Sequence, residues 1–329
     1  MDKEGLIKKL NTADLRIKRA KAVMGSKLGK AEQLIQEVKI ELEKEEEEEI
    51  PPHFHIRGNQ PYYLKKPIIL CGASEWCTLA RIMGIIPDVP AWQNITYDEY
   101  VTYLVRFPTN YVRQGIVPNL GLMQRFTEDM RLAGKIVEWT IYNRQAPYDM
   151  GDPRKAVNAL ISFFNVFFDA HNEFMDEEED VHIAIDLANY VIGLGGTVSA
   201  GAWGYSHHGE DNSDLFRQLY DRPRIRSVHE HWTKASIEKE NPTENVVLRN
   251  EYFDLGEEQP EHAIGFEGFK RIARETFEAR AKGCCYYPFI DSWKDMPTHG
   301  RRKAEDYLEF MGQLCRELNP QIVSIIMPT

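Results

Sequence analysis

Apolar residues recur at spacings of three and four along the first part of the chain. They are Leu6, Leu10, Ala13, Ile17, Ala20 and Met24. This spacing is typical of one face of an α-helix, and the residues between them are mostly charged. Because a narrow apolar stripe buries little area by itself, such a helix is expected to lie on another surface. We therefore predict a charged helical arm over residues 1–50, ended by Pro51 and Pro52.

The same spacing predicts most of the remaining elements. Thr96 and Glu99 form a capping box that begins one helix. Further helices are predicted over 118–144, 152–175, 182–192, 226–240, 264–282 and 301–318. The stretch from 157 to 168 is apolar nearly all round, which favours a helix at the centre of the core or one buried at an interface. Gly193 to Gly204 holds five glycines in twelve residues and is predicted to be a loop.

These elements predict a mainly α fold. It would be a multi-helix globular core with a long N-terminal helical arm, few short strands and a short apolar C-terminal tail. The expected parts are the arm (1–50), a linker (51–66) and a helical core domain with its tail (67–329). The pattern shows no internal repeat with a period of 20 to 50 residues, and no regular alternation of strands and helices.

Charge adds information through its position. The net charge is −11, from 51 acidic and 40 basic residues. The runs 43–49 and 176–180 hold six and five acids, so the remaining 40 acids equal the 40 bases. The segment 1–30 carries nine Lys or Arg against three acids. Two interpretations remain open: a solvated helix with uneven charge, or an arm that docks on an acidic neighbour or on phosphate.

Other features indicate an intracellular protein. No apolar run reaches the roughly 18 residues of a membrane helix, and the first residues lack the apolar region of a signal peptide. The five cysteines are odd in number, and Cys284 and Cys285 are adjacent, which does not fit a disulfide framework. We expect a cytoplasmic location with no membrane partner, or a virion if the chain packages nucleic acid.

The motifs of metal and catalytic sites are incomplete. Glu179 and His182 have the Glu-x-x-His spacing of helical di-iron sites, but no second copy is found. His229 and His231 would point apart on a helix. The sequence Gly193-Leu-Gly-Gly196 lacks the Lys-Ser/Thr ending of a phosphate-binding loop. We therefore predict no metal and no cofactor, and an enzyme is the less favoured reading.

A basic segment with an aromatic neighbour favours nucleic acid. Arg222, Arg224 and Arg226 alternate, which places three guanidiniums on one side of an extended segment. Tyr220 precedes them, and Lys65 and Lys66 follow two tyrosines. Cations along a backbone and rings on the bases suit single-stranded RNA. Surface salt bridging is the alternative interpretation.

The leading hypothesis is a self-assembling, homo-oligomeric structural protein, such as a viral coat or nucleocapsid-like protein that packages single-stranded RNA. Its subunits would associate through the arm and the apolar tail. The residues expected at these contacts are Leu6, Leu10, Ile17, Met24, Ile322 and Ile325. One alternative is an enzyme without a compact motif that uses the Gly-rich 193–209 loop with Trp203, His207 and His208. Another is a helical adaptor or regulatory module.

Overall fold

The computed structural model describes part of the chain. The described residues are 53–58, 60–74, 77–86, 96–144, 146, 148–171, 178–202, 225–228, 246–252, 265–278, 282–286, 297–298 and 302–320. The chain divides into two compact units, Met1–Pro51 and Pro52–Thr329, and all described residues belong to the second. The predicted arm and the tail segment 322–326 lie outside them.

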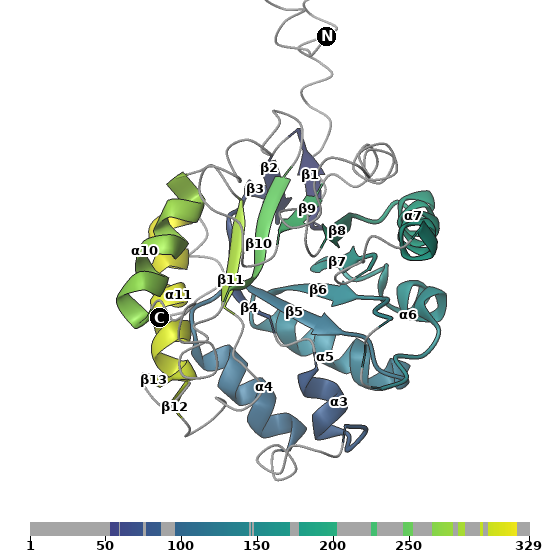
Figure 1. Cartoon of the computed structure of the whole chain (residues 1–329), viewed down its shortest axis with the longest axis horizontal. Helices are drawn as coiled ribbons and strands as arrows, with labels where there is room; N and C mark the ends of the chain where they lie inside the picture. Colours follow the sequence, from purple (N-terminus) through teal and green to yellow (C-terminus); the bar gives the residue numbers. More distant parts are fainter. Residues whose placement is uncertain are drawn as a thin grey trace, which may run out of the picture. The chain divides into compact units, whose positions relative to one another are not determined.

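Eight parallel strands form a closed barrel. Each pairs with the next along the chain, and β11 pairs with β4 to close the ring (Figure 1). The strands are β4 (Leu70–Ser74), β5 (Tyr111–Gly115), β6 (Ile136–Thr140), β7 (Val166–Asp169), β8 (Val198–Ala202), β9 (Ile225–Val228), β10 (Val246–Tyr252) and β11 (Gly283–Tyr286).

Helices connect the strands and lie outside the barrel (Figure 1). Helix α5 contacts β6, α7 contacts β8, and α11 contacts both β4 and β11. The described helices are α3 (Thr78–Ile82), α4 (Tyr97–Arg106), α5 (Leu120–Leu132), α6 (Pro153–Leu160), α7 (Glu178–Gly193), α10 (Gly265–Glu278) and α11 (Ala304–Leu318). Eight parallel strands inside a ring of helices constitute a (β/α)8, or TIM, barrel.

The mainly α prediction is therefore wrong, and the reason lies in the buried strands. The predicted helix 118–144 is α5 followed by β6, and the predicted helix 152–175 contains α6 and β7. A strand of a parallel barrel is covered on both faces, so it is apolar on all sides and has no period-two alternation. Periodicity alone does not separate such a strand from a buried helix segment.

The expectation of no strand–helix rhythm is also wrong. Each of the strands β4, β5, β6 and β7 is followed by at least one helix before the next strand begins. The glycine-rich stretch from 193 to 204 is not a continuous loop, because it contains β8. Its small residues had hidden a strand that pairs with β7 and β9.

Three of the predicted helices are confirmed, whereas the predicted helix 226–240 begins in strand β9 and otherwise lies outside the described residues. Thr96 and Glu99 form the capping box at the start of α4, with the Glu99 N–H donating to Thr96 Oγ1 at 3.2 Å. Helices α10 and α11 lie within the predicted ranges 264–282 and 301–318. These helices have one buried and one exposed face, so their period of 3.6 is visible in the sequence.

A small antiparallel sheet closes the amino end of the barrel. It comprises β1 (His55–Arg57), β2 (Gln60–Tyr63) and β3 (Lys66–Pro67). Phe54 stacks on Phe167 with ring centroids 4.8 Å apart. A buried apolar cluster joins this sheet to the first inward-facing residues of four strands: Phe54, Tyr63, Ile68, Leu70, Tyr111, Ile136 and Phe167. A further pair, β12 (Pro297–Thr298) and β13 (Arg302–Lys303), precedes α11.

Strand alternation decides which side chains enter the barrel. Val112, Val137 and Phe168 pack with the helices in the large outer core. Their neighbours Tyr111, Ile136 and Phe167 lie in the inner cluster. Because strand side chains alternate between faces, the residues two positions further on also point inward. In three adjacent strands these residues are charged, and they form the site described next.

Candidate active site

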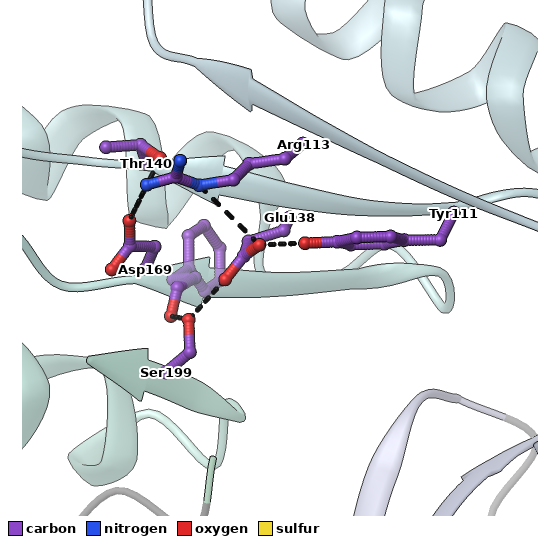
Figure 2. A network of polar contacts seen from close by, with 7 residues as sticks. Tyr111, Arg113, Glu138, Thr140, Asp169 and Ser199 are labelled. Atoms are coloured by element: carbon purple, nitrogen blue, oxygen red, sulfur yellow. Dashed lines mark hydrogen bonds and ion pairs between the residues drawn. The ribbon is translucent and has the colours of Figure 1, made fainter. Parts of the chain in front are cut away.

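Three charged side chains lie inside the barrel above the apolar cluster. They are Arg113 of β5, Glu138 of β6 and Asp169 of β7, and each is completely buried (Figure 2). A barrel interior is normally filled with branched apolar side chains. Burial of charged groups costs several kcal/mol each unless they are paired. The charged layer is thus the most unusual feature of this interior.

The guanidinium of Arg113 lies between the two carboxylates. Its Nη2 donates to Asp169 Oδ2 at 2.7 Å, and its Nε lies 3.7 Å from Glu138 Oε2. Thr140, on the strand between, donates from Oγ1 to the same Asp169 oxygen at 3.1 Å. One cation thus serves two carboxylates, and the three groups together carry a net negative charge if both carboxylates are ionised.

Glu138 is the group whose protonation the barrel changes most clearly. Burial raises its pKa from 4.5 to about 7, and the nearby Asp169 adds to this; Arg113 and hydrogen bonds from Ser199 and Tyr111 act in the opposite direction. Tyr111 Oη contacts Glu138 Oε2, and Ser199 Oγ contacts Oε1 (Figure 2). The carboxyl group therefore changes its protonation state near neutral pH.

The hydroxyl of Ser199 indicates where that proton can reside. Ser199 Oγ lies 3.3 Å from the carbonyl oxygen of Phe168 as well as in contact with Glu138. A serine hydroxyl has one hydrogen to donate. If Ser199 donates to the Phe168 carbonyl, a proton on Glu138 completes the second bond. With Glu138 protonated, both contacts of the Ser199 hydroxyl, to the Phe168 carbonyl and to Glu138, can be hydrogen bonds.

Two buried polar atoms at the strand ends lack a hydrogen-bond partner within the described part of the chain. They are Asp169 Oδ1, on the last residue of β7, and Ser74 Oγ, on the last residue of β4. A buried acceptor without a partner costs about 1–3 kcal/mol, so its presence calls for an explanation. Both residues lie at the carboxyl ends of their strands, where the active sites of these barrels are built.

A second polar group follows the ends of β6 and β7. His171, two residues after Asp169, is buried, and its ring meets the edge of Tyr142 with centroids 4.8 Å apart. Its Nε2 lies 3.7 Å from Asp180 Oδ1 of α7, and Arg144 Nη1 lies 3.5 Å from the same oxygen. Polar residues therefore continue from the interior layer onto the connecting segments.

Metal and membrane features are not found in the described part of the chain. No group of three or more His, Cys, Asp or Glu side chains there could hold a metal ion. Glu179 and His182, considered above for their spacing, both line a cavity beside α7. None of the helices described is long and apolar enough to cross a bilayer.

The residues expected to bind RNA do not gather at this layer where the structure describes them. Lys65 lies in the turn between β2 and β3, and Lys66 is the first residue of β3, at the amino end of the barrel. Arg226 is part of β9. Arg222, Arg224 and Tyr220 lie outside the described residues, as do Trp203, His207 and His208. The expected contacts Leu6, Leu10, Ile17, Met24, Ile322 and Ile325 also lie outside them.

Sequence reasoning missed the charged layer. Arg113, Glu138 and Asp169 belong to three separate strands with a helix between each pair, so no short motif contains them. A usable signal existed in three short apolar segments that each carry a polar residue at an inward position: Tyr111–Gly115, Ile136–Thr140 and Val166–Asp169. Two of these segments, Ile136–Thr140 and Val166–Asp169, lie within predicted helices, and Tyr111–Gly115 lies in no predicted element. The alternation that would have put the three residues on one face was therefore not used.

No family model and no curated protein matches this chain in sequence. Its structure resembles an endo-1,4-β-mannanase from Rhizomucor miehei, with a TM-score of 0.59, 8% identity, and coverage of 82% of this chain and 99% of that one. It also resembles an endo-1,4-β-mannanase from Eisenia fetida, with a TM-score of 0.52, 10% identity, and coverage of 80% of this chain and 95% of that one. For Gas2p of Saccharomyces cerevisiae, bound to laminaripentaose, the TM-score is 0.50 and the identity 11%, with coverage of 81% of this chain and 69% of that one.

These likenesses correct the predicted function. The similar structures are carbohydrate-active enzymes, and their fold conflicts with a capsid or nucleocapsid protein that coats viral RNA. The helical arm and basic segment had suggested assembly because no catalytic motif was visible in the sequence. At identities of 8–11% the resemblance extends to the fold, which is the (β/α)8 barrel found in glycoside hydrolases.

Proposed function

We propose that this protein is a carbohydrate-active enzyme that cleaves or transfers glycosidic bonds at the carboxyl end of its barrel. The observation that carries the proposal is the buried layer of Arg113, Glu138 and Asp169. The amino-end layer of the same strands is apolar and closed by the β1–β3 sheet. Polar groups concentrated in the other half of a barrel are typical of an active site.

Glycoside hydrolysis requires two carboxyl groups on opposite sides of the scissile bond. Among the described residues of the eight strands, acidic side chains occur at Glu138, Asp169 and Glu251. Glu138 and Asp169 are both engaged by Arg113. Glu251 is the sixth of seven residues in β10, near its carboxyl end. We therefore assign Glu251 as one reacting carboxylate.

The second carboxylate should come from a strand across the mouth. In the barrel order, β8 and β9 separate β7 from β10, so their carboxyl ends do not lie side by side. Glu173 follows the last residue of β7 by four positions in the sequence. It lies outside the described residues and is assigned from its sequence position alone. We propose Glu173 and Glu251 as the reacting pair.

Arg113, Asp169 and Glu138 then act as the floor of the site. Their contacts tie β5, β6, β7 and β8 together beneath the strand ends. A reacting group must be held close to its productive geometry, and rigid supporting contacts achieve this. Asp169 Oδ1, which has no hydrogen-bond partner among the described residues, gives the floor one acceptor that a substrate hydroxyl, or a water held by it, can use.

The substrate class follows from the fold likeness and the chemistry of the pair. We propose a neutral oligosaccharide or polysaccharide, with β-1,4-mannan and laminari-oligosaccharides as the first substrates to test. The full chain would be incubated with mannohexaose, laminarihexaose, cellohexaose and xylohexaose, and products would be separated by chromatography. Shorter or longer oligosaccharides are the expected products. A chain that changes none of them, at high enzyme concentration and from pH 4 to 8, would contradict the proposal.

Variants connect the activity to the pair. Glu173→Gln and Glu251→Gln should each lower the rate of cleavage by about 10²- to 10⁴-fold. Glu275→Gln, at a half-buried position on α10 where the carboxylate pairs with Arg271, should retain the parent rate. An aryl glycoside with a good leaving group distinguishes the roles, because it needs little protonation and thus spares the variant that lacks the acid. Full activity in both glutamine variants would remove the assignment.

A further inference from the structure

The cavity lined by Glu179 and His182 lies beside the barrel mouth, between helices α6 and α7. It has a volume of about 690 Å³, within the range of small-molecule sites. Tyr142 borders it from the segment after β6, and Asp152, Pro153 and Arg154 border it from the start of α6. One face of α7 completes it, with residues at helical spacing: Glu179, His182, Ile183, Asp186 and Leu187.

The cavity lies at the same end of the molecule as the proposed active site. Helices α6 and α7 begin after the carboxyl ends of β6 and β7, and the cavity is lined by the first turn of α6 and the first three turns of α7. Tyr142 also contacts His171, which follows Asp169 by two residues. A chain-like ligand that leaves the barrel mouth over β6 and β7 would therefore meet Tyr142 next.

The lining combines the groups that bind an uncharged sugar. Tyr142 offers a half-buried aromatic ring, and Pro153, Ile183 and Leu187 offer apolar surface for the C–H faces of a ring. Carboxylates of Asp152, Glu179 and Asp186 are hydroxyl acceptors. Arg154, which pairs with Asp186 at 2.5 Å and lies 5.3 Å over the Tyr190 ring, presents a fixed donor at the rim.

The charge of the cavity lining further limits the class of ligand that can bind. Three carboxylates face one guanidinium and His182, so the described lining is net negative when the histidine is neutral. An anionic ligand would be repelled, because like charges in a partly buried pocket raise its energy. A neutral glycan meets no such penalty, and its many hydroxyls can donate to the carboxylate acceptors of this lining.

We propose that the cavity between α6 and α7 is an ancillary subsite for a neutral oligosaccharide segment, outside the reacting centre. The proposal rests on the proposed function in that the segment belongs to a glycan whose other part occupies the barrel mouth. The subsite would bind additional sugar units of a long substrate, so it would lower KM for long substrates more than for short ones.

The test compares substrate lengths in variants of the cavity. Tyr142→Ala removes the ring, Tyr142→Phe retains it, and His182→Trp fills the space from an exposed position on α7. Ile192→Trp, also exposed on α7 but not lining the cavity, is the matched control. We expect Tyr142→Ala and His182→Trp to raise KM for hexasaccharides about five- to tenfold, with kcat and trisaccharide KM unchanged. Tyr142→Phe and Ile192→Trp should behave as the parent chain.

The outcomes separate this inference from the proposed function. If the parent chain cleaves hexasaccharides and the cavity variants keep its KM for them, the subsite is refuted while the enzyme assignment stands. If the parent chain cleaves nothing, the enzyme assignment fails, and ligand-observed NMR with mannohexaose and laminarihexaose decides the subsite by itself. Binding lost in Tyr142→Ala and retained in Tyr142→Phe would uphold it. No binding, or equal binding by oligogalacturonate, would overturn it.

Discussion

Arg113 Nη2 lies 2.7 Å from Asp169 Oδ2 inside the barrel, and neither side chain has exposed surface. The pair joins β5 to β7 across β6, and Glu138 of β6 lies 3.7 Å from the same guanidinium. Breaking a buried ion pair by removing one partner is far more costly than replacing the pair as a whole. The charged layer therefore holds strands together only as long as it stays complete.

Removal of the cation should destabilise the fold. Arg113→Met leaves two buried carboxylates beside each other, and we expect the free energy of unfolding to fall by about 3–5 kcal/mol. Adding Asp169→Asn and Glu138→Gln to this variant removes the uncompensated charges and should recover part of the loss. Urea unfolding followed by tryptophan fluorescence measures both. A single variant as stable as the parent chain would mean that the layer is solvated.

Glu138 should make stability depend on pH in a defined direction. The unfolded chain releases this proton near pH 4.5 and the folded chain near pH 7, so the folded state binds more protons between these values. Its contribution to stability is complete below pH 4.5 and is lost as pH rises through about 7, by about 3 kcal/mol. Glu138→Gln, which imitates the protonated form, should abolish this fall.

The pH profile has to be read as a difference between variant and parent chain. Lys135 is also buried, donates to the Phe107 and Thr109 carbonyls at 2.9 and 2.6 Å, and has its pKa lowered by burial to about 7. Because its folded pKa lies below 10.5, it makes stability rise with pH above about 7. Subtracting the two profiles cancels this contribution. A difference that does not change between pH 4.5 and 7 would exclude a raised pKa at Glu138.

A single glycine tests the register of the barrel. A Cβ on Gly72 of β4 would lie 1.7 Å from the Tyr111 carbonyl oxygen of β5, which is backbone and cannot yield. We expect Gly72→Ala to prevent folding or to lower the melting temperature by tens of degrees. Gly121→Ala is the control, because its Cβ would meet only Asn119 Oδ1 at 3.6 Å, and a helical alanine gains up to about 1 kcal/mol. Similar melting temperatures for both variants would contradict the strand pairing.

The sequence could predict the outer helices but not the barrel inside them. Helices α4, α10 and α11 each have one solvent-exposed face, so capping residues and apolar periodicity locate them in the sequence. Strands such as Val166–Asp169 are buried on both faces, so their continuous apolar sequence cannot be distinguished from a segment of buried helix. The site is less visible still, because Arg113, Glu138 and Asp169 lie far apart in the sequence and become neighbours only through strand register.

The most direct test of the account is the initial rate of hexasaccharide cleavage by the full chain and by its Glu251→Gln variant. We expect measurable cleavage by the parent chain on at least one β-linked hexasaccharide. We expect the rate to fall by about 10²- to 10⁴-fold in Glu251→Gln at an unchanged melting temperature, and to stay normal in Glu275→Gln. Equal rates in the parent chain and Glu251→Gln, or no cleavage of any hexasaccharide by the parent chain, would contradict it.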